Sequence, residues 1–564
     1  MRIARVGIRN FRGIRSLDLD LGLITVLIGE NNSGKTSVLD ALKFCLRELS
    51  PRRRIVFSGM DFHLTDGQAE PSSADPIEIE VMFSDSPDDH WDDELVGRLN
   101  RAGILQIDEK DRNHVRLRVT CEYDRSSRDF SHLWSFLDLK GDPLSRARSR
   151  ALSVLQDEIR YYYLTALRDA GRHFDAKGPF WRPFLQNSEL SVEKKLEIEE
   201  KLQEVNDLVV SSHASFEQVQ NGLRRVQSVV PLATGEAVSI EAVPGRMFDM
   251  LAKAQVQLGT TTGAKIPLDR HGEGTQSLAV LLLFSAFLKA QAEGAPVLAL
   301  EEPEAHLHPS AIRALGELVR GFAGQKLIST HSGELLAETD VGDICRLART
   351  RNGIKAFRVP SDLLSPEETR KFNYHIRQAR GELLFARCWL LVEGETESWV
   401  FPAAAHALDL NLHREGVRVV EFKQSDVGML AKIANALGIP WYCVGDDDTN
   451  RAKDEPKLRQ NLAGAEEADR FVFPYPDIEV NLLRNGYADV YQKYMPQQNL
   501  AKISSAPGDP SYWEEYADKL PSRAKTRAAA DVAIEMEVRG DAGVTPEIRS
   551  VLEKVVSLAR SGWQ

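Results

Sequence analysis

The stretch Gly29-Glu-Asn-Asn-Ser-Gly34-Lys35-Thr36 decides the fold of the first half of the chain. It follows an apolar run, Leu23-Ile-Thr-Val-Leu-Ile28, and precedes the predicted helix 36–49. Between a buried strand and a helix, the pattern G-x-x-x-x-G-K-[ST] forms a phosphate-binding loop. Its N–H groups would surround phosphate oxygens, Lys35 would contact the β- and γ-phosphates, and the Thr36 hydroxyl would bind Mg²⁺. The loop residues expected to bind nucleotide are Gly29, Asn31, Asn32, Gly34, Lys35, Thr36 and Ser37.

Two adjacent carboxylates follow a second apolar strand, in Val297-Leu-Ala-Leu-Glu301-Glu302-Pro303. Alone, such a pair would more often be a solvated strand end. Together with a phosphate loop, it predicts one carboxylate for the Mg²⁺ shell and one that orients or deprotonates water.

Two further segments narrow the class of phosphate-loop protein. Lys326-Leu-Ile-Ser-Thr330-His331 reads as a strand that ends in a histidine. His271-Gly-Glu-Gly274-Thr-Gln276 precedes a long apolar helix, 276–290, and its small residues would let the helix N-terminus approach a phosphate. Taken singly, each segment has an ordinary structural explanation.

In this order, with Glu302-Pro-Glu-Ala-His-Leu-His308-Pro309 among them, the four segments resemble ABC-type ATPase heads of the RecF and SMC kind over residues 1 to about 350. The resemblance implies a head-to-head homodimer, in which Gly272, Gly274 and Gln276 of one copy complete the ATP site of the other. It also implies that Glu301 binds Mg²⁺, Glu302 is the catalytic carboxylate and His331 is the switch histidine. Asp61 is the candidate for the role of the Q-loop residue.

A second group of acidic residues follows two later strands. Leu391-Val392-Glu393-Gly-Glu-Thr-Glu397 places one glutamate at a strand end and another a helical turn later, and Trp441-Tyr-Cys-Val444-Gly-Asp446-Asp-Asp448 ends in acids. Each segment alone is better explained as solvated surface. Together they predict a divalent-metal site, since convergent carboxylates repel one another without a cation and oxygen ligands suit Mg²⁺ or Mn²⁺.

These two strand ends resemble the Toprim domain, and a Toprim domain after an ABC head is the layout of the OLD (overcoming lysogenization defect) family of ATP-powered nucleases, closest to its class 2 members. The resemblance implies two Mg²⁺ or Mn²⁺ ions about 4 Å apart. It gives these residues roles: Glu393, Glu397, Asp446 and Asp448 as metal ligands, Asp477 and Glu479 as later ligands, and Lys525 facing the scissile phosphate. The alternative for Asp477, Glu479 and Lys525 is an ordinary polar surface.

The predicted fold class is α/β: an ABC-type P-loop ATPase head with a helical dimerisation insertion, followed by a Rossmann-like Toprim domain. The segment 188–229 is rich in Glu and Lys with apolar residues near helical spacing. It is either a dimerisation arm or a solvated helix packed on its own domain. The predicted boundaries are 1–170 for the N-terminal ATPase lobe, 171–260 for the insertion, 261–375 for the C-terminal ATPase lobe and 380–564 for the Toprim nuclease domain.

Charge and composition limit the partners. With 71 Lys and Arg against 83 Asp and Glu the net charge is −12, which argues against coating nucleic acid through bulk positive charge. Local basic clusters at 52–54, at Arg146, Arg148 and Arg150, and at 519–527 are either DNA contacts or solvated charge. Five dispersed cysteines, an arginine-interrupted N-terminus and no long apolar run predict a cytoplasmic protein without a membrane segment.

The expected function is ATP-gated or ATP-powered, metal-dependent cleavage of DNA in phage defence or DNA repair, with a UvrD-type helicase as a possible partner. One alternative is a non-cleaving, RecF-like ATP-dependent DNA clamp. Another is a primase or topoisomerase activity borrowed through the Toprim fold, because fold alone does not fix chemistry.

Overall fold

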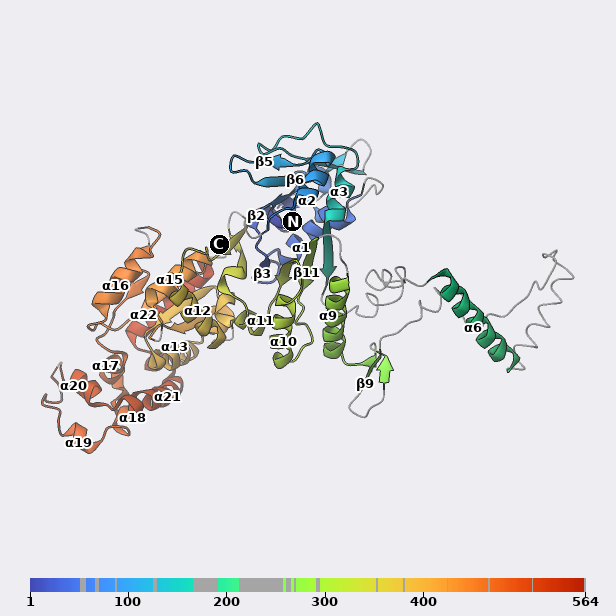
Figure 1. Cartoon of the computed structure of the whole chain (residues 1–564). Helices are drawn as coiled ribbons and strands as arrows, with labels where there is room; N and C mark the ends of the chain where they lie inside the picture. Colours follow the sequence, from blue (N-terminus) through green and yellow to red (C-terminus); the bar gives the residue numbers. More distant parts are fainter. Residues whose placement is uncertain are drawn as a thin grey trace, which may run out of the picture. The chain divides into compact units, whose positions relative to one another are not determined.

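The computed structural model divides by its internal contacts into two units, Met1–Leu164 with Glu293–Glu304 and Pro309–Gln564, and Thr165–Ala292 with Ala305–His308 (Figure 1). The structure describes the whole chain except residues 51–56, 66–69, 87–88, 125–128, 166–190, 213–256, 260–264, 268–269, 291–294, 351–352, 379–380, 424, 465–466, 510 and 562–564. No helix among the described residues is long and apolar enough to cross a membrane. All five cysteines are buried and none forms a disulfide.

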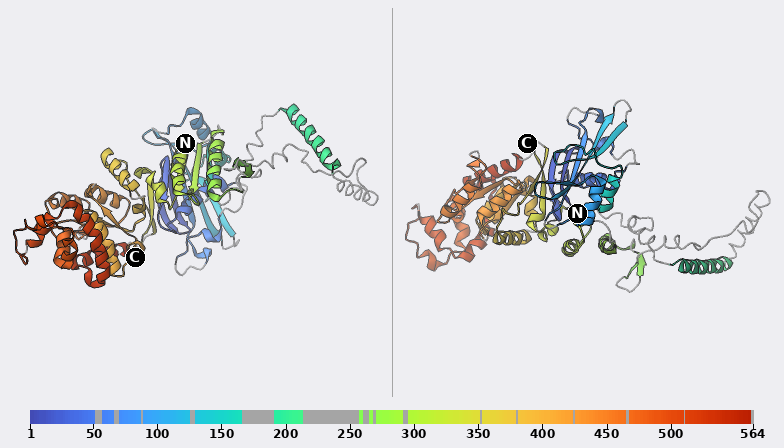
Figure 2. Two further views of the ribbon diagram at one scale, coloured as in Figure 1. Left: turned by 90° about the horizontal axis from the view of Figure 1, so that it is seen from below. Right: turned by 45° about the horizontal axis from the view of Figure 1, so that its top comes forward.

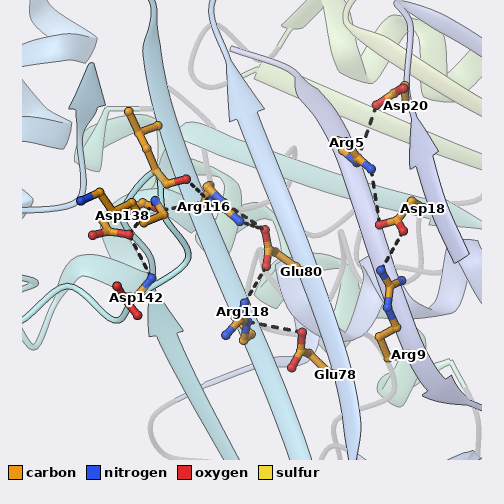
Figure 3. Close-up of polar contacts among 12 residues, drawn as sticks. Arg5, Arg9, Asp18, Asp20, Glu78, Glu80, Arg116, Arg118, Asp138 and Asp142 are labelled. Atoms are coloured by element: carbon orange, nitrogen blue, oxygen red, sulfur yellow. Dashed lines mark hydrogen bonds and ion pairs between the residues drawn. The ribbon is translucent and has the colours of Figure 1, made fainter. Parts of the chain in front are cut away.

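An antiparallel sheet opens the first unit, in the order β2-β1-β4-β6-β5 with β7 paired to β6. Its strands are β1 (Ile3–Phe11), β2 (Ile14–Asp20), β4 (Ile77–Ser84), β5 (Gln106–Ile107), β6 (Asn113–Asp124) and β7 (Asp129–Phe136). Side chains alternate between a buried face and a charged face, as the period of a strand requires. Figure 3 shows ion pairs of the charged face, including Arg9 with Asp18 at 2.7 Å and Arg118 with Glu80 at 3.1 Å.

The second sheet of this unit carries the phosphate loop. Its order is β14-β13-β3-β12-β11-β8, and all neighbours are parallel except β13 and β14. Its strands are β3 (Ile24–Ile28), β8 (Ile159–Leu164), β11 (Ala295–Glu301), β12 (Gln325–Ser329), β13 (Ile344–Thr350) and β14 (Gly353–Arg358). Because β12 lies between β3 and β11, the loops after these three strands lie side by side. The strands predicted at 297–300 and 326–329 are confirmed.

Helices connect the strands of these two sheets. They are α1 (Lys35–Lys43), α2 (Asp93–Ala102), α3 (Ala151–Glu158), α10 (Pro309–Arg320) and α11 (Gly333–Ala337). A further helix, α12 (Pro366–Gln378), follows β14 and leads to the third sheet. The predicted helix 36–49 is α1 followed by a wider π-helical turn, Phe44–Glu48.

A third sheet, fully parallel, forms the C-terminal part in the order β16-β15-β17-β18. Its strands are β15 (Cys388–Val392), β16 (Val417–Glu421), β17 (Trp441–Val444) and β18 (Phe471–Val472). β15 is buried throughout, which explains its apolar sequence. In both views of Figure 2 the C-terminal helices, orange to red, lie together around this sheet. The helices of this part are α13 (Glu395–Ala407), α14 (Leu412–Glu415), α15 (Val427–Ala436), α16 (Arg451–Gln460), α17 (Ile478–Leu482), α18 (Ala488–Gln492), α19 (Gln497–Leu500), α20 (Tyr512–Lys519), α21 (Ser522–Arg539) and α22 (Pro546–Ser561).

The second unit contains α6 (Val192–Ser211), the antiparallel pair β9 (Gln257–Gly259) and β10 (Lys265–Pro267), and α9 (Glu273–Ala290). Most of the predicted insertion, 171–260, lies outside the described residues. Within α6, Leu196 and Leu208 are exposed. The role of this helix in dimerisation stays a prediction, as do the domain boundaries.

Candidate ATPase and metal sites

The phosphate loop joins β3 to α1. Gly29 adopts φ 147°, and a Cβ there would lie 2.3 Å from the carbonyl oxygen of Leu347, so a larger residue would clash with β13. The Lys35 ammonium donates to the carbonyls of Gly29 and Glu30, both at 2.9 Å. Burial lowers the pKa of Lys35 to about 8, although Glu302 and Glu30 oppose this effect. A buried ammonium held only by carbonyl oxygens is suited to bind phosphate.

Glu301, the last residue of β11, meets the phosphate loop. The Thr36 hydroxyl donates a hydrogen bond to Glu301 Oε1, across 265 residues of sequence. The Tyr163 hydroxyl, at the end of β8, donates to Glu301 Oε2 at 2.8 Å. A hydroxyl and a carboxylate in contact at a phosphate loop are a donor set that Mg²⁺ prefers. The sequence analysis did not identify Tyr163. The sequence feature that could have pointed to it was its position near the end of an apolar strand.

Glu302 and His331 face each other across neighbouring strand ends. Glu302 has φ 44°, a backbone conformation that costs energy in a residue with a side chain. Its N–H donates to the Ser329 carbonyl at 2.9 Å, and its Oε1 lies 3.9 Å from His331 Nε2. Burial, together with the charge of Lys35, lowers the pKa of His331. The histidine is therefore neutral at pH 7 and able to accept a proton.

Glu304 is a second residue that sequence reasoning did not assign. Its Oε1 accepts hydrogen bonds from the Thr330 hydroxyl and from the His331 N–H, the latter at 3.1 Å. Burial raises its pKa, and its Oε2 is buried without a hydrogen-bond partner among the described residues. The sequence feature that could have identified Glu304 was its position two residues after Glu302. Glu304 fixes the backbone that carries the predicted switch histidine.

The predicted signature residues lie at the start of α9, in the second unit. The Gln276 amide donates to the His271 carbonyl at 2.6 Å. A Cβ on Gly274 would lie 2.8 Å from the His306 carbonyl oxygen, so the backbones approach closely there. Gly272 has open space around it. That these residues complete the ATP site of a second copy stays a prediction.

Asp61, the candidate for the Q-loop role, is held by several contacts in the structure. Its Oδ1 accepts from the Arg12 guanidinium at 2.9 Å, and its Oδ2 accepts from the Ser58 N–H and hydroxyl, both at 2.8 Å. Arg12 also pairs with Asp40 on α1. Arg12 thereby ties the β1–β2 turn to the helix of the phosphate loop, and Asp61 holds the Arg12 guanidinium. The part of Asp61 in catalysis stays a prediction.

Three predicted metal ligands meet in the third sheet. Glu393 follows β15 and Asp446 follows β17, and these paired parallel strands end at the same edge. The Asp446 N–H donates to Glu393 Oε2 at 3.4 Å, and Glu397 is 3% exposed one turn into α13. Burial, with the charges of Glu397 and Glu393, raises the pKa of Asp446 to about 10, and burial raises that of Glu397 to about 7. The acids are therefore close enough to oppose one another's ionisation.

Asp448 lies at the exposed rim of this cluster. Its two oxygens accept from the Asn450 N–H and side-chain amide at 2.7 and 2.9 Å. Burial raises the pKa of Glu393, and the charge of Asp448 contributes to the rise. Asp448 is thus near the cluster, but its oxygens are engaged within a turn.

Asp477, Glu479 and Lys525 form a partly buried ion-pair network beside the cluster. The Lys525 ammonium donates to Asp477 Oδ2 at 2.7 Å and to Glu479 Oε2 at 3.3 Å. The Thr396 hydroxyl donates to Glu479 Oε1 at 2.8 Å. Burial, together with the adjacent Asp477, raises the pKa of Glu479 to about 8. Burial opposes ionisation of Lys525, but the charges of Glu479 and Asp477 raise its pKa. Lys525 thus lies between the two acids that were expected to bind metal.

The donor chemistry of the cluster fits a hard divalent cation. Asp446 Oδ1 is buried and has no hydrogen-bond partner among the described residues, an arrangement that is costly unless a cation approaches it. In the part of the chain that the structure describes, no three His, Cys, Asp or Glu side chains could hold a metal ion as they stand. Three ligands around one ion would therefore require side-chain rotations.

Of the predicted DNA-contact clusters, 52–54 lies outside the described residues. Arg148 and Arg150 are exposed. In the cluster 519–527, Lys519 pairs with Asp518, while Arg523 is exposed on α21. Their contact with DNA stays a prediction.

Comparisons with known proteins match both halves of the chain. Residues 1–382 match the family described as "Protein of unknown function (DUF2813)", and residues 384–448 match "Overcoming lysogenization defect protein-like, TOPRIM domain". The chain is 30% identical to the Escherichia coli protein YbjD, over 99% of both chains. It is 25% identical to the OLD nuclease of Thermus scotoductus, over 83% of this chain and 87% of that one, and 22% identical to the endonuclease GajA of Bacillus cereus, over 85% and 82%. The chain therefore belongs to the DUF2813 family and is an OLD-family protein, in which an ATPase head precedes a Toprim domain.

Proposed function

We propose that the protein is an ATP-hydrolysing, divalent-metal-dependent DNA endonuclease. The observation that carries the proposal is the convergence of Glu393, Glu397 and Asp446 at one sheet edge, with a buried Asp446 oxygen that has no hydrogen-bond partner among the described residues. The nuclease relatives that share both halves of the chain support it.

In the proposed site, Glu393, Glu397, Asp446 and Asp448 would hold Mg²⁺ or Mn²⁺, two ions in the full site. Bound there, the cations would supply a polarised phosphate and a more acidic attacking water. Asp446 would lose the proton that its raised pKa retains. Lys525 would offer its positive charge to the non-bridging phosphate oxygens.

The ATPase reaction would use the residues around the phosphate loop. Lys35 would exchange its two carbonyl partners for phosphate oxygens. Thr36 and Glu301 would hold Mg²⁺, and Tyr163 would keep the Glu301 carboxylate in place. Glu302 would orient the attacking water, with neutral His331 at 3.9 Å as its partner.

The test is nicking of supercoiled plasmid in Mg²⁺, Mn²⁺ and Ca²⁺, with and without ATP. We expect Glu393→Gln and Asp446→Asn to abolish cleavage, and Lys35→Ala to abolish only the effect of ATP. Glu415→Gln, which removes a half-buried Toprim carboxylate paired with Arg560, is the matched control and should cleave as wild type does. Wild-type protein that binds ATP and DNA but cuts under no condition would contradict the proposal and favour the non-cleaving clamp.

The proposed context is phage defence or DNA repair, with the protein acting on DNA as a homodimer. A UvrD-type helicase is the proposed protein partner. Mass photometry with and without ATP tests the dimer, and a pull-down with the purified helicase tests the partner.

A further inference from the structure

Three consecutive residues directly before β15 are each contacted by the ATPase head. We call this stretch, Phe385-Ala386-Arg387, the relay segment. It starts at the last residue of a 3-10 turn, Glu382–Phe385, and ends where β15 begins.

Each contact of the relay segment comes from a different part of the head. The ring of Phe385 stacks on the ring of His331, with centroids 6.4 Å apart and an interplanar angle of 17°. The carbonyl of Ala386 accepts from the guanidinium of Arg346 on β13 at 3.3 Å. The guanidinium of Arg387 donates to Glu30 Oε1 in the phosphate loop at 2.7 Å, across 357 residues of sequence.

The head residues in these contacts lie at the points that a nucleotide would alter. Glu30 is inside the phosphate loop, and its carbonyl accepts from the Lys35 ammonium. Phosphates bound in the loop would compete for that ammonium, so the backbone of Glu30 would lose a partner when nucleotide binds. His331 is the proposed partner of Glu302, which would orient the attacking water. Both changes would reach the relay segment through side chains already in contact with it.

The far end of β15 carries the metal site. β15 lies between β16 and β17 and is buried along its whole length. Glu393 directly follows it, beside Asp446. A packed strand moves as a unit, so a shift at Arg387 would shift Glu393 relative to the other acids.

A cavity beside the relay segment gives it room to move. The cavity has a volume of about 320 Å³ and is lined by residues of the phosphate loop and by Arg346, Phe385 and Arg387. A second arrangement of Phe385 and Arg387 therefore has space available next to the start of β15.

We propose that Phe385 and Arg387 are positioning residues that couple occupancy of the ATP site to the position of Glu393. The coupling is a difference in free energy between two placements of β15, one favoured with nucleotide and one without it. The cleavage consequence rests on the proposed function, whereas the structural coupling does not.

The first experiment is hydrogen–deuterium exchange of the full chain at constant Mg²⁺, with and without saturating AMP-PNP, followed in peptides covering 388–397. We expect nucleotide to change exchange in these peptides of the wild type. Phe385→Ala and Arg387→Ala should lose most of that change, whereas Arg387→Lys should retain it. Arg560→Ala, which removes an exposed Toprim arginine paired with Glu415, is the matched control. A titration with a fluorescent nucleotide determines, for every variant, the nucleotide concentration that saturates the site.

Two further variants separate coupling from damage to the fold. Phe385→Leu and Arg387→Gln keep much of the side-chain volume, so they decide the question if an alanine variant does not fold. In a double-mutant cycle, the variant that combines Glu30→Ala with Arg387→Ala should lose no more of the nucleotide-induced change in exchange than either single variant loses. The inference would be overturned if AMP-PNP did not change exchange in the wild type. It would also be overturned if AMP-PNP changed exchange in the relay variants as much as in the wild type.

The second readout is the ratio of cleavage rates with and without nucleotide. We expect the ratio measured for Arg387→Ala to be closer to one than the wild-type ratio by a factor of about five. A factor of this size is at the lower end of coupling between sites in proteins. A wild type that cuts no DNA would refute the proposed function, while the exchange experiment would still decide the coupling. Cleavage ratios unchanged in both relay variants would count against the inference alone.

Discussion

The ammonium of Lys525 lies 2.7 Å from Asp477 Oδ2 and 3.3 Å from Glu479 Oε2. Both acids were expected to bind metal, and the lysine was expected to face phosphate. In the structure the lysine neutralises the acids instead, since burying two adjacent carboxylates without a cation would be costly. The same three residues therefore have a structural role that is separate from the proposed catalytic one.

Removing this ammonium should destabilise the metal-free protein. We expect Lys525→Met to lower the free energy of unfolding by about 1–3 kcal/mol at pH 7.5 in EDTA, because the buried Glu479 and the partly buried Asp477 lose their partner. Urea unfolding followed by tryptophan fluorescence measures it. Lys519→Met, at a half-exposed lysine paired with the exposed Asp518, is the control and should unfold as wild type does. Equal stability of both variants would contradict the structural role.

Metal binding should strengthen as pH rises. The pKa of Asp446 is raised from 3.8 to about 10, and those of Glu397 and Glu479 to about 7 and 8, so these groups retain protons that a cation must displace. We expect the Mn²⁺ dissociation constant to fall between pH 6 and 9, with proton release in calorimetry. Asp446→Asn should remove much of the dependence, and a pH-independent affinity would exclude the site.

The raised pKa of Asp446 also determines how the stability of the metal-free protein changes with pH. Between pH 4 and 10 the folded protein holds more protons at Asp446 than the unfolded chain does, so this group lowers stability as pH rises. Melting temperatures in EDTA should therefore show a smaller decline from pH 6 to 9 for Asp446→Asn than for wild type. A steeper decline in the variant would contradict the assigned burial.

Tyr163 should matter for ATP hydrolysis through Glu301. Loss of its hydrogen bond would free the carboxylate beside Thr36, and a hydrogen bond to a charged group contributes about 1.5–3 kcal/mol. We expect Tyr163→Phe to raise the Mg²⁺ concentration for half-maximal ATPase activity about tenfold. Tyr162→Phe, on the same strand, is the control. Unchanged Mg²⁺ dependence in Tyr163→Phe would show that the hydrogen bond does not serve the metal.

Glu304 should affect turnover more than nucleotide binding. Its carboxylate holds Thr330 and the backbone of His331, two residues that follow β12. We expect Glu304→Ala to lower kcat for ATP about tenfold while KM changes little, because a misplaced histidine affects the reaction step. Glu317→Ala, exposed on α10, is the control. A rise in KM alone would contradict this role.

Local sequence patterns predicted much of the fold and part of the site. The glycines, lysine and threonine of 29–36 predicted the phosphate loop because each side-chain type meets a requirement of the backbone there. Strands that end just before Glu393 and Gly445 were predicted, and β15 and β17 end there in the structure. The parallel pairing of these strands brought Glu393 and Asp446 together, as expected when both acids follow buried strands.

The sequence could not predict contacts made by single side chains across long stretches of chain. Tyr163 and Glu301 are 138 residues apart, and Arg387 and Glu30 are 357 apart. No periodicity or motif marks such a pair, because each partner alone is an ordinary polar residue.

The sequence by itself determined the phosphate loop, the two acidic strand ends and their order along the chain, since these depend on residue type and short spacing. Only the tertiary structure decided that Lys525 neutralises Asp477 and Glu479, that Tyr163 and Glu304 support the ATPase residues, and that Phe385 and Arg387 contact the head. The physical reason is that such contacts depend on how distant segments pack, and packing brings together side chains whose sequence neighbours carry no record of the contact.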